Sequence, residues 1–325
     1  MNKPRIIFFD IDGTLIDMEK KQITPRMLET LHRLQANGIK LCIATGRSPM
    51  TVPLQEFPGV QFDVFVTYNG SYCYDGQRTL FENPIPREDV QTILRNAAAL
   101  GRPLCLATEK RLACNGSDVD LADYFAIAKM SVTIAEDFDQ VAEGKVYQLM
   151  VGGRKEEYAR LMQDVHEAKI AAWWDRAMDI IPAEGGKGAG IEKVLEAYGL
   201  TRADAMAFGD GNNDIEMFQA VGTGVAMANG SDRLKAIAAD VCGSCAEDGI
   251  YHYCLEHGLI CVQMQNAPRT NWPEGRSLQG DPITFDVYSF FRVEAGIFIN
   301  TAIAQDDFFG SVVVIIADQQ EFFHF

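Results

Sequence analysis

The chain has 325 residues with a formal net charge of −16 at pH 7, and 47% of the residues are hydrophobic while 23% are charged. This length exceeds one compact core, so we expect two domains. The charge excludes a general binder of nucleic acid or of anionic membranes, because such surfaces need basic patches. An anionic small substrate would therefore need local help from a cation or from the positive end of a helix.

The N-terminal segment does not resemble an export signal, because its apolar run covers only residues 6–9. The longest apolar run elsewhere, at residues 311–317, is too short to span a bilayer as a helix. The eight cysteines are scattered along the chain, which is typical of reduced thiols rather than of a disulfide framework. We therefore predict a cytoplasmic protein without a membrane or nucleic-acid partner. The sequence does not indicate an oligomeric state.

Short apolar runs alternate with helical patterns in the first and the later part of the chain. A helix begins near Thr24 and Pro25, where Thr24 is expected to cap it, and ends before Gly38. The predicted strands cover residues 5–9, 39–45, 63–70, 205–211 and 223–229, with a brief one near 239–243. Nearly continuous apolar strands between helices indicate an α/β fold with a Rossmann-like, doubly wound parallel sheet.

A differently built stretch interrupts this pattern. The predicted elements there are a helix (87–100), strands near 103–115, a helix (118–129), a strand (146–153), a helix (154–168) and a strand pair (170–182). We predict an inserted α+β domain at 83–184 within a core made of residues 1–82 and 185–262. The aromatic-rich extension at 263–325 has no chemical motif, and its role cannot be read. Its aromatic density predicts that it packs on something or promotes aggregation.

The candidate site residues follow the predicted parallel strands, because ligands of open parallel sheets bind at the carboxyl ends of the strands. They are Asp10, Asp12, Thr45, Gly46, Arg47, Asp210, Asn213 and Asp214. Two carboxylates 4 Å apart repel by about 4 kcal/mol at an effective dielectric constant of about 20, so a cation has to lie among the four aspartates. Oxygen ligands alone favour Mg²⁺. Lys187 lies in a glycine-rich turn that opens a helix, where it would help to bind an anion.

These motifs resemble, in order, the four signatures of the haloacid dehalogenase-like phosphatases: DIDGTL, ATGR, the isolated Lys187 and FGDGNNDIEMF. The best match is the Cof-type branch, which comprises sugar-phosphate phosphatases with a large α/β cap between the second and third motifs. The inserted stretch at 83–184 falls where that branch has its cap, and the resemblance covers about residues 4 to 260. It implies an Mg²⁺-dependent phosphatase of small phosphorylated metabolites, sugar phosphates first, with the cap choosing the substrate.

The resemblance also implies a role for each acidic residue. Asp10 would attack phosphorus and form an aspartyl-phosphate, which divides the hydrolysis into two easier displacements. Asp12 would protonate the leaving oxygen and afterwards take a proton from the attacking water. The carboxylates of Asp10 and Asp210 and the backbone carbonyl of Asp12 would ligate Mg²⁺, while Asp214 would bind through water or orient the ligands.

The remaining motif residues are assigned by the same resemblance to the phosphate. Thr45, with the adjacent Gly46, and Lys187 would hold the phosphoryl oxygens, where positioning and charge stabilisation supply most of the catalysis. Asn213 would contact phosphate or fix Lys187. Arg47 would help to bind the substrate or would only anchor its own loop.

Two other functions combine similar residues. A phosphomutase or phosphotransferase of the same superfamily would pass the phosphoryl group to a second sugar. A signalling receiver domain also uses acidic residues, Mg²⁺, Thr and Lys on a parallel sheet, but receivers are much shorter, have no inserted domain and carry the acceptor on a middle strand. Receiver function is therefore the less favoured alternative.

Two local features have competing interpretations. Cys242 and Cys245 form a C-x-x-C with histidines nearby, but a second C-x-x-C is missing, so zinc binding is disfavoured. Residues 252–261 are predicted as one helix whose apolar side chains pack inward. In the inserted domain, Trp173 and Trp174 are adjacent, so one of them would face the interior and the other would line a substrate pocket.

Overall fold

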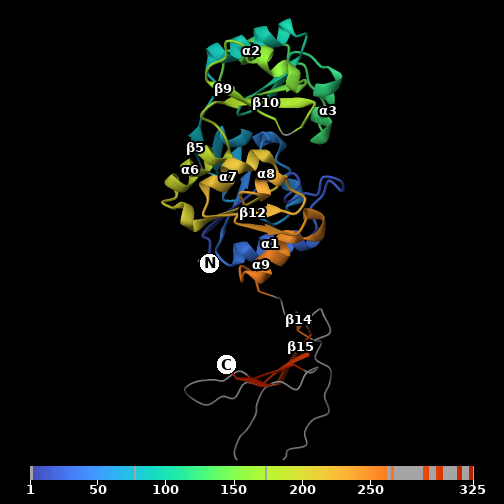
Figure 1. Ribbon diagram of the computed structural model, residues 1–325, viewed down its shortest axis with the longest axis vertical. Helices are drawn as coiled ribbons and strands as arrows, with labels where there is room; N and C mark the ends of the chain where they lie inside the picture. The colour runs from blue at the N-terminus through green and yellow to red at the C-terminus, as the bar shows by residue number, and fades with distance from the viewer. Residues whose placement is uncertain are drawn as a thin grey trace, which may run out of the picture. The chain divides into compact units, whose positions relative to one another are not determined.

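The computed structural model describes residues 3–76, 78–172 and 174–261, together with five short strands of the extension. Contacts divide the chain into two compact units, Met1–Ile260 and Cys261–Phe325. The described strands of the second unit pair as one antiparallel sheet (Figure 1). They are β14 (Gln265–Asn266), β15 (Tyr288–Arg292), β16 (Phe298–Ala302), β17 (Val313–Ile316) and β18 (Phe322–His324). The predicted packing of the aromatic side chains of this extension lies outside the described residues.

The first unit contains an eight-stranded sheet in the order β13-β12-β11-β1-β2-β3-β4-β5. Its strands are β1 (Ile6–Phe9), β2 (Lys40–Ala44), β3 (Val64–Thr67), β4 (Tyr72–Asp75), β5 (Thr79–Glu82), β11 (Ala205–Gly209), β12 (Thr223–Met227) and β13 (Asp240–Cys242). All neighbouring pairs from β13 to β3 are parallel, while β4 and β5 add two antiparallel strands. β3 is shorter than predicted because Tyr68 and Asn69 turn the chain with left-handed φ angles of 51° and 50°.

Helices cover both faces of this sheet (Figure 1). One face is covered by α1 (Pro25–Ala36) and α9 (Gly249–Glu256), and the other by α6 (Lys187–Ala197), α7 (Ile215–Ala220) and α8 (Asp232–Lys235). The alternation of side chains along β1 explains this arrangement: Phe9 packs toward α1, while Phe8 packs toward α6. The Thr24 side chain accepts a hydrogen bond from the backbone nitrogen of Met27 at 3.0 Å, which is the expected cap of α1. The predicted doubly wound α/β fold is confirmed.

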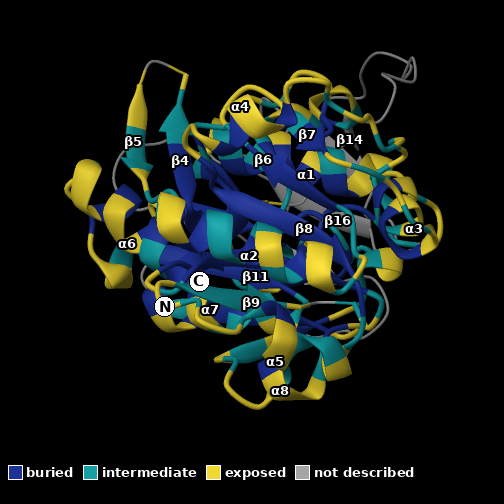
Figure 2. Ribbon diagram, turned by 90° about the horizontal axis from the view of Figure 1, so that it is seen from above, coloured by how far each residue is buried: buried dark blue, intermediate teal, exposed yellow. Residues whose placement is uncertain are grey.

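The inserted domain, the cap, is built on a second sheet with the order β7-β6-β8-β10-β9, in which all neighbours are antiparallel. Its strands are β6 (Leu104–Ala107), β7 (Leu112–Cys114), β8 (Gln148–Gly152), β9 (Ala168–Ala171) and β10 (Ala177–Pro182). One face packs on α2 (Arg87–Ala99), α4 (Phe138–Ala142) and α5 (Tyr158–Leu161). The other face packs on α3 (Val119–Ile127) and on Tyr68 and Tyr72 of the core. Central strands β6 and β8 are therefore buried, as Figure 2 shows.

Two predicted helices differ from the structure. The helix predicted at 154–168 is reduced to a 3₁₀ turn at Lys155–Glu157 and the single turn α5, because the chain leaves the helical path after Leu161 and Asp164 adopts a left-handed φ of 58°. The helix predicted at 252–261 begins earlier, at Gly249, and ends at Glu256, two residues before Gly258 with its φ of 65°.

The contact division places no boundary inside the first unit, so the cap limits at 83 and 184 stay a prediction. Within the described residues, no helix combines the length and the apolar character that crossing a bilayer requires.

Candidate active site

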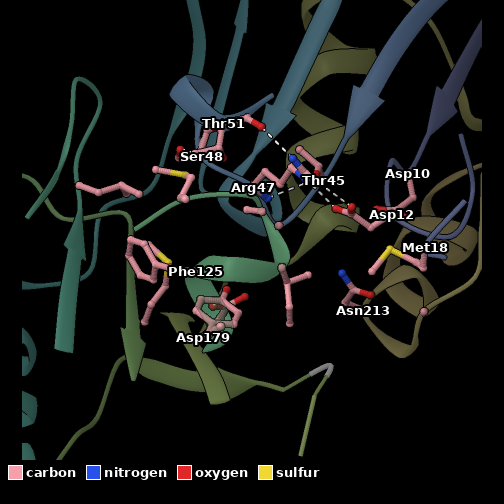
Figure 3. A pocket seen from close by; sticks show the side chains of 18 of the residues that line it. Asp10, Asp12, Met18, Thr45, Arg47, Ser48, Thr51, Phe125, Asp179 and Asn213 are labelled. Carbon is pink, nitrogen blue, oxygen red and sulfur yellow. Dashed lines mark hydrogen bonds and ion pairs between the residues drawn. The ribbon is translucent and has the colours of Figure 1, made fainter. Parts of the chain in front are cut away.

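The strands bring the predicted motifs to one edge of the core sheet. In the parallel register, Phe9 at the end of β1 pairs with Phe208 of β11 on one side and with Ile43 of β2 on the other. The residues that follow these strands, Asp10, Thr45 and Asp210, therefore lie at the same edge, and all three line a cavity (Figure 3).

Three carboxylates gather there around one ammonium group. Ligand oxygens of Asp10, Asp210 and Asp214 lie within 4.8 Å of one another. Lys187, the first residue of α6, is fully buried, and its Nζ donates to Asp10 Oδ1 at 2.5 Å and to Asp214 Oδ1 at 2.6 Å. Lys187 pairs with two of the three carboxylates, so the four groups together carry a net charge of −2 when all are ionised. One divalent cation would neutralise this charge.

Burial and mutual repulsion shift the pKa values of this cluster. Burial raises the pKa of Asp10 well above its ordinary value, the negative charges of Asp214 and Asp210 raise it further, and Lys187 opposes the rise. Burial and then the charge of Asp214 raise the pKa of Asp210 to about 7. Burial lowers the pKa of Lys187, but Asp10 and Asp214 outweigh this effect, so its pKa is raised. Without a bound cation the cluster is therefore short of positive charge.

Asp214 holds its neighbours in place. Its Oδ2 accepts hydrogen bonds from the backbone nitrogens of Asp210 and Gly211 at 3.0 and 2.9 Å, while its Oδ1 binds Lys187. The Asp214 side chain is fully buried and, like Lys187, is not among the residues that line the cavity. These contacts favour orientation of the site over direct ligation. Thr14 Oγ1 donates to Asp210 Oδ1 at 3.3 Å and so orients that carboxylate.

Asp12 and Arg47 form a bidentate ion pair at the cavity wall. Arg47 Nε donates to Asp12 Oδ2 at 2.7 Å and Arg47 Nη2 to Asp12 Oδ1 at 2.6 Å, as the dashed lines in Figure 3 mark. Arg47 Nη1 also donates to the backbone carbonyl of Thr51 at 3.0 Å. Arg47 therefore anchors its own loop, as one of its two predicted roles requires, and it also lines the cavity, while its predicted role in binding the substrate stays a prediction.

Thr45, Gly46 and Asn213 complete the core side of the cavity. Thr45 Oγ1 accepts a hydrogen bond from the backbone nitrogen of Arg47 at 3.1 Å, which fixes the turn after β2. The Asn213 side chain donates to Asn69 Oδ1 at 3.2 Å, so the structure places it against Asn69 rather than against Lys187.

The cavity has a volume of ≈ 260 Å³ and is lined by residues of both the core and the cap. From the cap come Asp179 and residues of α3 and its neighbourhood, among them Phe125 (Figure 3). Trp174 is not among the lining residues, and Trp173 lies outside the described residues. The cavity provides room for a small molecule beside the aspartate cluster.

The cysteine motif does not form a cluster of metal ligands in the described part of the chain. Cys242 is buried with its Sγ 3.5 Å from Met227 Sδ, and the group of at least three candidate metal ligands found among the described residues is the aspartate cluster. Tyr253 and Leu259 are buried in the core, as expected for inward-packing side chains.

Comparison with known proteins decides the family. The family model described as haloacid dehalogenase-like hydrolase matches residues 7–254. The chain belongs to the haloacid dehalogenase-like hydrolase family. It is 34% identical over 258 residues to the putative phosphatase YkrA of Bacillus subtilis (strain 168). The aligned region covers 79% of this chain and 98% of the relative. The predicted family and the enzyme class, phosphoric monoester hydrolase, are confirmed.

Two further relatives differ in what their names say they act on. The 5-amino-6-(5-phospho-D-ribitylamino)uracil phosphatase YitU of Bacillus subtilis (strain 168) is 28% identical, over 78% of this chain and 98% of the relative. A solved structure described as the HAD subclass IIB sugar phosphatase BT4131 is 28% identical with a TM-score of 0.72, over 79% of this chain and all of that chain. The family is therefore shared, while the named substrates diverge.

Sequence reasoning missed several polar residues of this haloacid dehalogenase-like hydrolase that lie between cap and core. They are Asn69, Tyr124, Gln148 and Asp179. Asn69 follows β3, so the rule that strand ends carry the site could have found it. Asp179 interrupts the apolar stretch AMDIIP of β10, and a charged residue within a fully buried strand is a signal of function or pairing.

The hydrolase needs glycine at position 13, because the Asp210 side chain lies too close for a Cβ there. An added Cβ would lie 2.2 Å from Asp210 Oδ2, and the φ of Gly13 is 87°. We expect Gly13→Ala to displace the Asp210 carboxylate and to reduce phosphatase activity at least about tenfold, with a loss of stability of roughly 1–3 kcal/mol. Phosphate release and urea unfolding measure the two effects.

Gly38→Ala is the matched control for this substitution. Gly38 also has a positive φ, of 76°, but nothing lies within 4 Å of its added Cβ. It should cost only the backbone strain, about 1 kcal/mol, and leave activity intact. If the two variants had equal activities, the claim that a Cβ at position 13 displaces the Asp210 carboxylate would be contradicted.

Proposed function

We propose that this enzyme hydrolyses phosphate monoesters of small metabolites through an aspartyl-phosphate on Asp10, with Mg²⁺ as its cofactor. The observation that carries the proposal is the cluster of Asp10, Asp210, Asp214 and Lys187 at the strand ends, beside a cavity shared by core and cap. The names of the relatives describe phosphatases, which supports hydrolysis of a phosphate ester, and the cavity of ≈ 260 Å³ has room for a small substrate.

The donor set fits a hard divalent cation. All side-chain ligand atoms are carboxylate oxygens, which suit Mg²⁺ better than zinc or copper. The net negative charge of the cluster would be balanced by one divalent ion. Asp10 and Asp210, with the backbone carbonyl of Asp12, would hold the ion. When bound, it would neutralise charge on the phosphoryl oxygens and keep Asp10 ionised.

The groups around Asp10 support its proposed role as the nucleophile. It follows a strand whose four side chains are all buried, and Lys187 fixes one of its oxygens at 2.5 Å. Its other oxygen would attack phosphorus, so that the Asp10 carboxylate oxygen gains the P–O bond and the ester oxygen leaves. Thr45 and Lys187, with Gly46 and Asn213 nearby, would hold the phosphoryl oxygens during this transfer.

Asp12 would move the proton in this reaction. It would donate to the departing ester oxygen in the first step and would accept a proton from the attacking water in the second. Arg47 donates to both oxygens of Asp12 in the structure, so one of these two contacts would have to open for that oxygen to carry the proton.

The assay that tests the proposal is phosphate release from 4-nitrophenyl phosphate. The purified enzyme should release phosphate with Mg²⁺, should lose the activity with a chelator and should regain it when Mg²⁺ is returned. Absence of turnover, with a long-lived phosphoenzyme formed from a small phosphodonor, would instead indicate a receiver. Isomerised sugar phosphate without free phosphate would indicate a mutase.

The leaving group should determine how much Asp12 matters. Nitrophenolate is stable without a proton, whereas the alkoxide of an alkyl phosphate is not, so we expect Asp12→Asn to slow an alkyl ester about 10²-fold or more and 4-nitrophenyl phosphate much less. Comparison of kcat/KM for the two substrates measures this, because kcat/KM reports the first displacement, whereas hydrolysis of the shared aspartyl-phosphate is slowed equally for both. Equal losses on both esters would count against Asp12 as the proton donor.

The relatives do not point to one substrate class. The family resemblance predicts sugar phosphates first, and one structural relative is described as a sugar phosphatase. Another relative is named for a phosphorylated ribitylamino-uracil. The chemistry of this enzyme's own cavity is therefore the better guide.

A further inference from the structure

The cavity has a second acidic group, on the cap side. Asp179 lies in β10 with only 1% of its surface exposed, and it lines the same cavity as Asp10 and Asp12. Its neighbours along the strand, Met178 and Ile180, point to the opposite face of the cap sheet and pack under the cap helices. Figure 3 shows Asp179 on the cap side of the cavity, away from the two core aspartates.

Both oxygens of Asp179 accept hydrogen bonds. The Tyr124 hydroxyl donates to Oδ1 at 2.7 Å, and Asn69 Nδ2 lies 3.5 Å from Oδ2. An ionised carboxylate presents only acceptors to the cavity. Asn69 also accepts from Asn213, so the group belongs to a chain of polar contacts that begins in the fourth motif of the core.

Most of the cap wall of the cavity is apolar. Its larger apolar side chains are Leu112, Phe125, Ile127, Met130 and Met150, while the Tyr124 hydroxyl donates to Asp179. A hexose would place several hydroxyl groups against this wall, where they would find few protein partners. A flat, apolar ring with a donor at one edge fits both the wall and the carboxylate.

We propose that Asp179 selects the leaving group, and that the preferred substrates are phosphate monoesters of nitrogen heterocycles or amines that direct an N–H donor at its carboxylate. This proposal rests on the proposed function. The carboxylate acts as a specificity-determining group, because it accepts a hydrogen bond from a nitrogen donor and repels a second anionic group on the substrate. A preference for hexose phosphates is the competing outcome.

The first test compares three substrates: pyridoxamine 5′-phosphate, glucose 6-phosphate and 4-nitrophenyl phosphate, whose leaving group has no N–H donor. The wild type should favour pyridoxamine 5′-phosphate over glucose 6-phosphate by about tenfold or more in kcat/KM. Asp179→Asn should remove most of this preference, mainly through KM, by lowering kcat/KM for pyridoxamine 5′-phosphate about tenfold more than for 4-nitrophenyl phosphate. Hexose phosphates as the best substrates, or equal losses on all three esters, would overturn the proposal.

Asp123→Asn is the matched control for this variant. Asp123 belongs to the same helix as Tyr124, pairs with Arg176 and does not line the cavity. Its substitution should leave the order of the three substrates unchanged. Thermal unfolding of both variants checks that the cap is folded.

A binding measurement separates this proposal from the proposed function. Calorimetric titration of the Asp10→Asn protein with pyridoxamine 5′-phosphate needs no turnover. Adding Asp179→Asn should weaken this binding about tenfold, even if the protein releases phosphate from no ester and the proposed function fails. Equal affinities of the single and the double variant would overturn the role of Asp179 while leaving the phosphatase proposal intact.

Discussion

Asp10→Asn is expected to reduce phosphate release by about 10³-fold or more, because the amide cannot form the acyl-phosphate bond on which the proposed reaction depends. The shape of the side chain is kept, and its oxygen can still accept from Lys187. Since burial and the neighbouring aspartates already raise the pKa of Asp10, a neutral group at this position should be tolerated by the fold. Initial rates with Mg²⁺ and saturating 4-nitrophenyl phosphate measure the loss.

Asp17→Asn provides the control for this prediction. Asp17 lies in the same N-terminal segment, accepts hydrogen bonds from the backbone nitrogens of Glu19 and Lys20, and does not line the cavity. Its activity should stay within about threefold of the wild type. Asp10→Asn with normal activity and an unchanged melting temperature would exclude Asp10 as the nucleophile.

Three of the four aspartates predicted to cluster do so because their positions depend on local rules, whereas the fourth, Asp12, pairs with Arg47. Asp10 and Asp210 directly follow apolar strands, and the parallel register brings the ends of such strands together whatever the rest of the chain does. Lys187 was found for a similar reason, since it opens the helix that follows a glycine-rich turn. These placements need no knowledge of distant contacts.

The polar contacts between cap and core could not be predicted in the same way. Asp179 and Asn69 meet only because the antiparallel cap sheet packs on the residues that follow β3, and sequence alone does not give that docking. The helix predicted at 154–168 was also too long. The apolar spacing of that segment suits a helix, but α5 ends at Leu161 and a left-handed turn follows at Asp164. Tertiary packing outweighs local propensity at such positions.

Lys187→Met is expected to destabilise the protein by roughly 3–5 kcal/mol, because it leaves two buried carboxylates without their shared cation. Lys187 is fully buried, and its two ion pairs with Asp10 and Asp214 are 2.5 and 2.6 Å long. Methionine fills a similar volume, so the loss reports charge rather than a cavity. Urea unfolding with a chelator present measures it. Lys193→Met, at a half-exposed position of the same helix, should change stability by about 0.5 kcal/mol or less.

A second substitution should recover part of this loss. Asp214→Asn removes one of the two stranded charges, so the Lys187→Met/Asp214→Asn protein should be more stable than the sum of the single effects predicts, by roughly 0.5–3 kcal/mol. Activity should not return, because the ammonium that fixes Asp10 is still missing. Strictly additive effects would mean that Lys187 and Asp214 do not share the charge balance that their 2.6 Å contact implies.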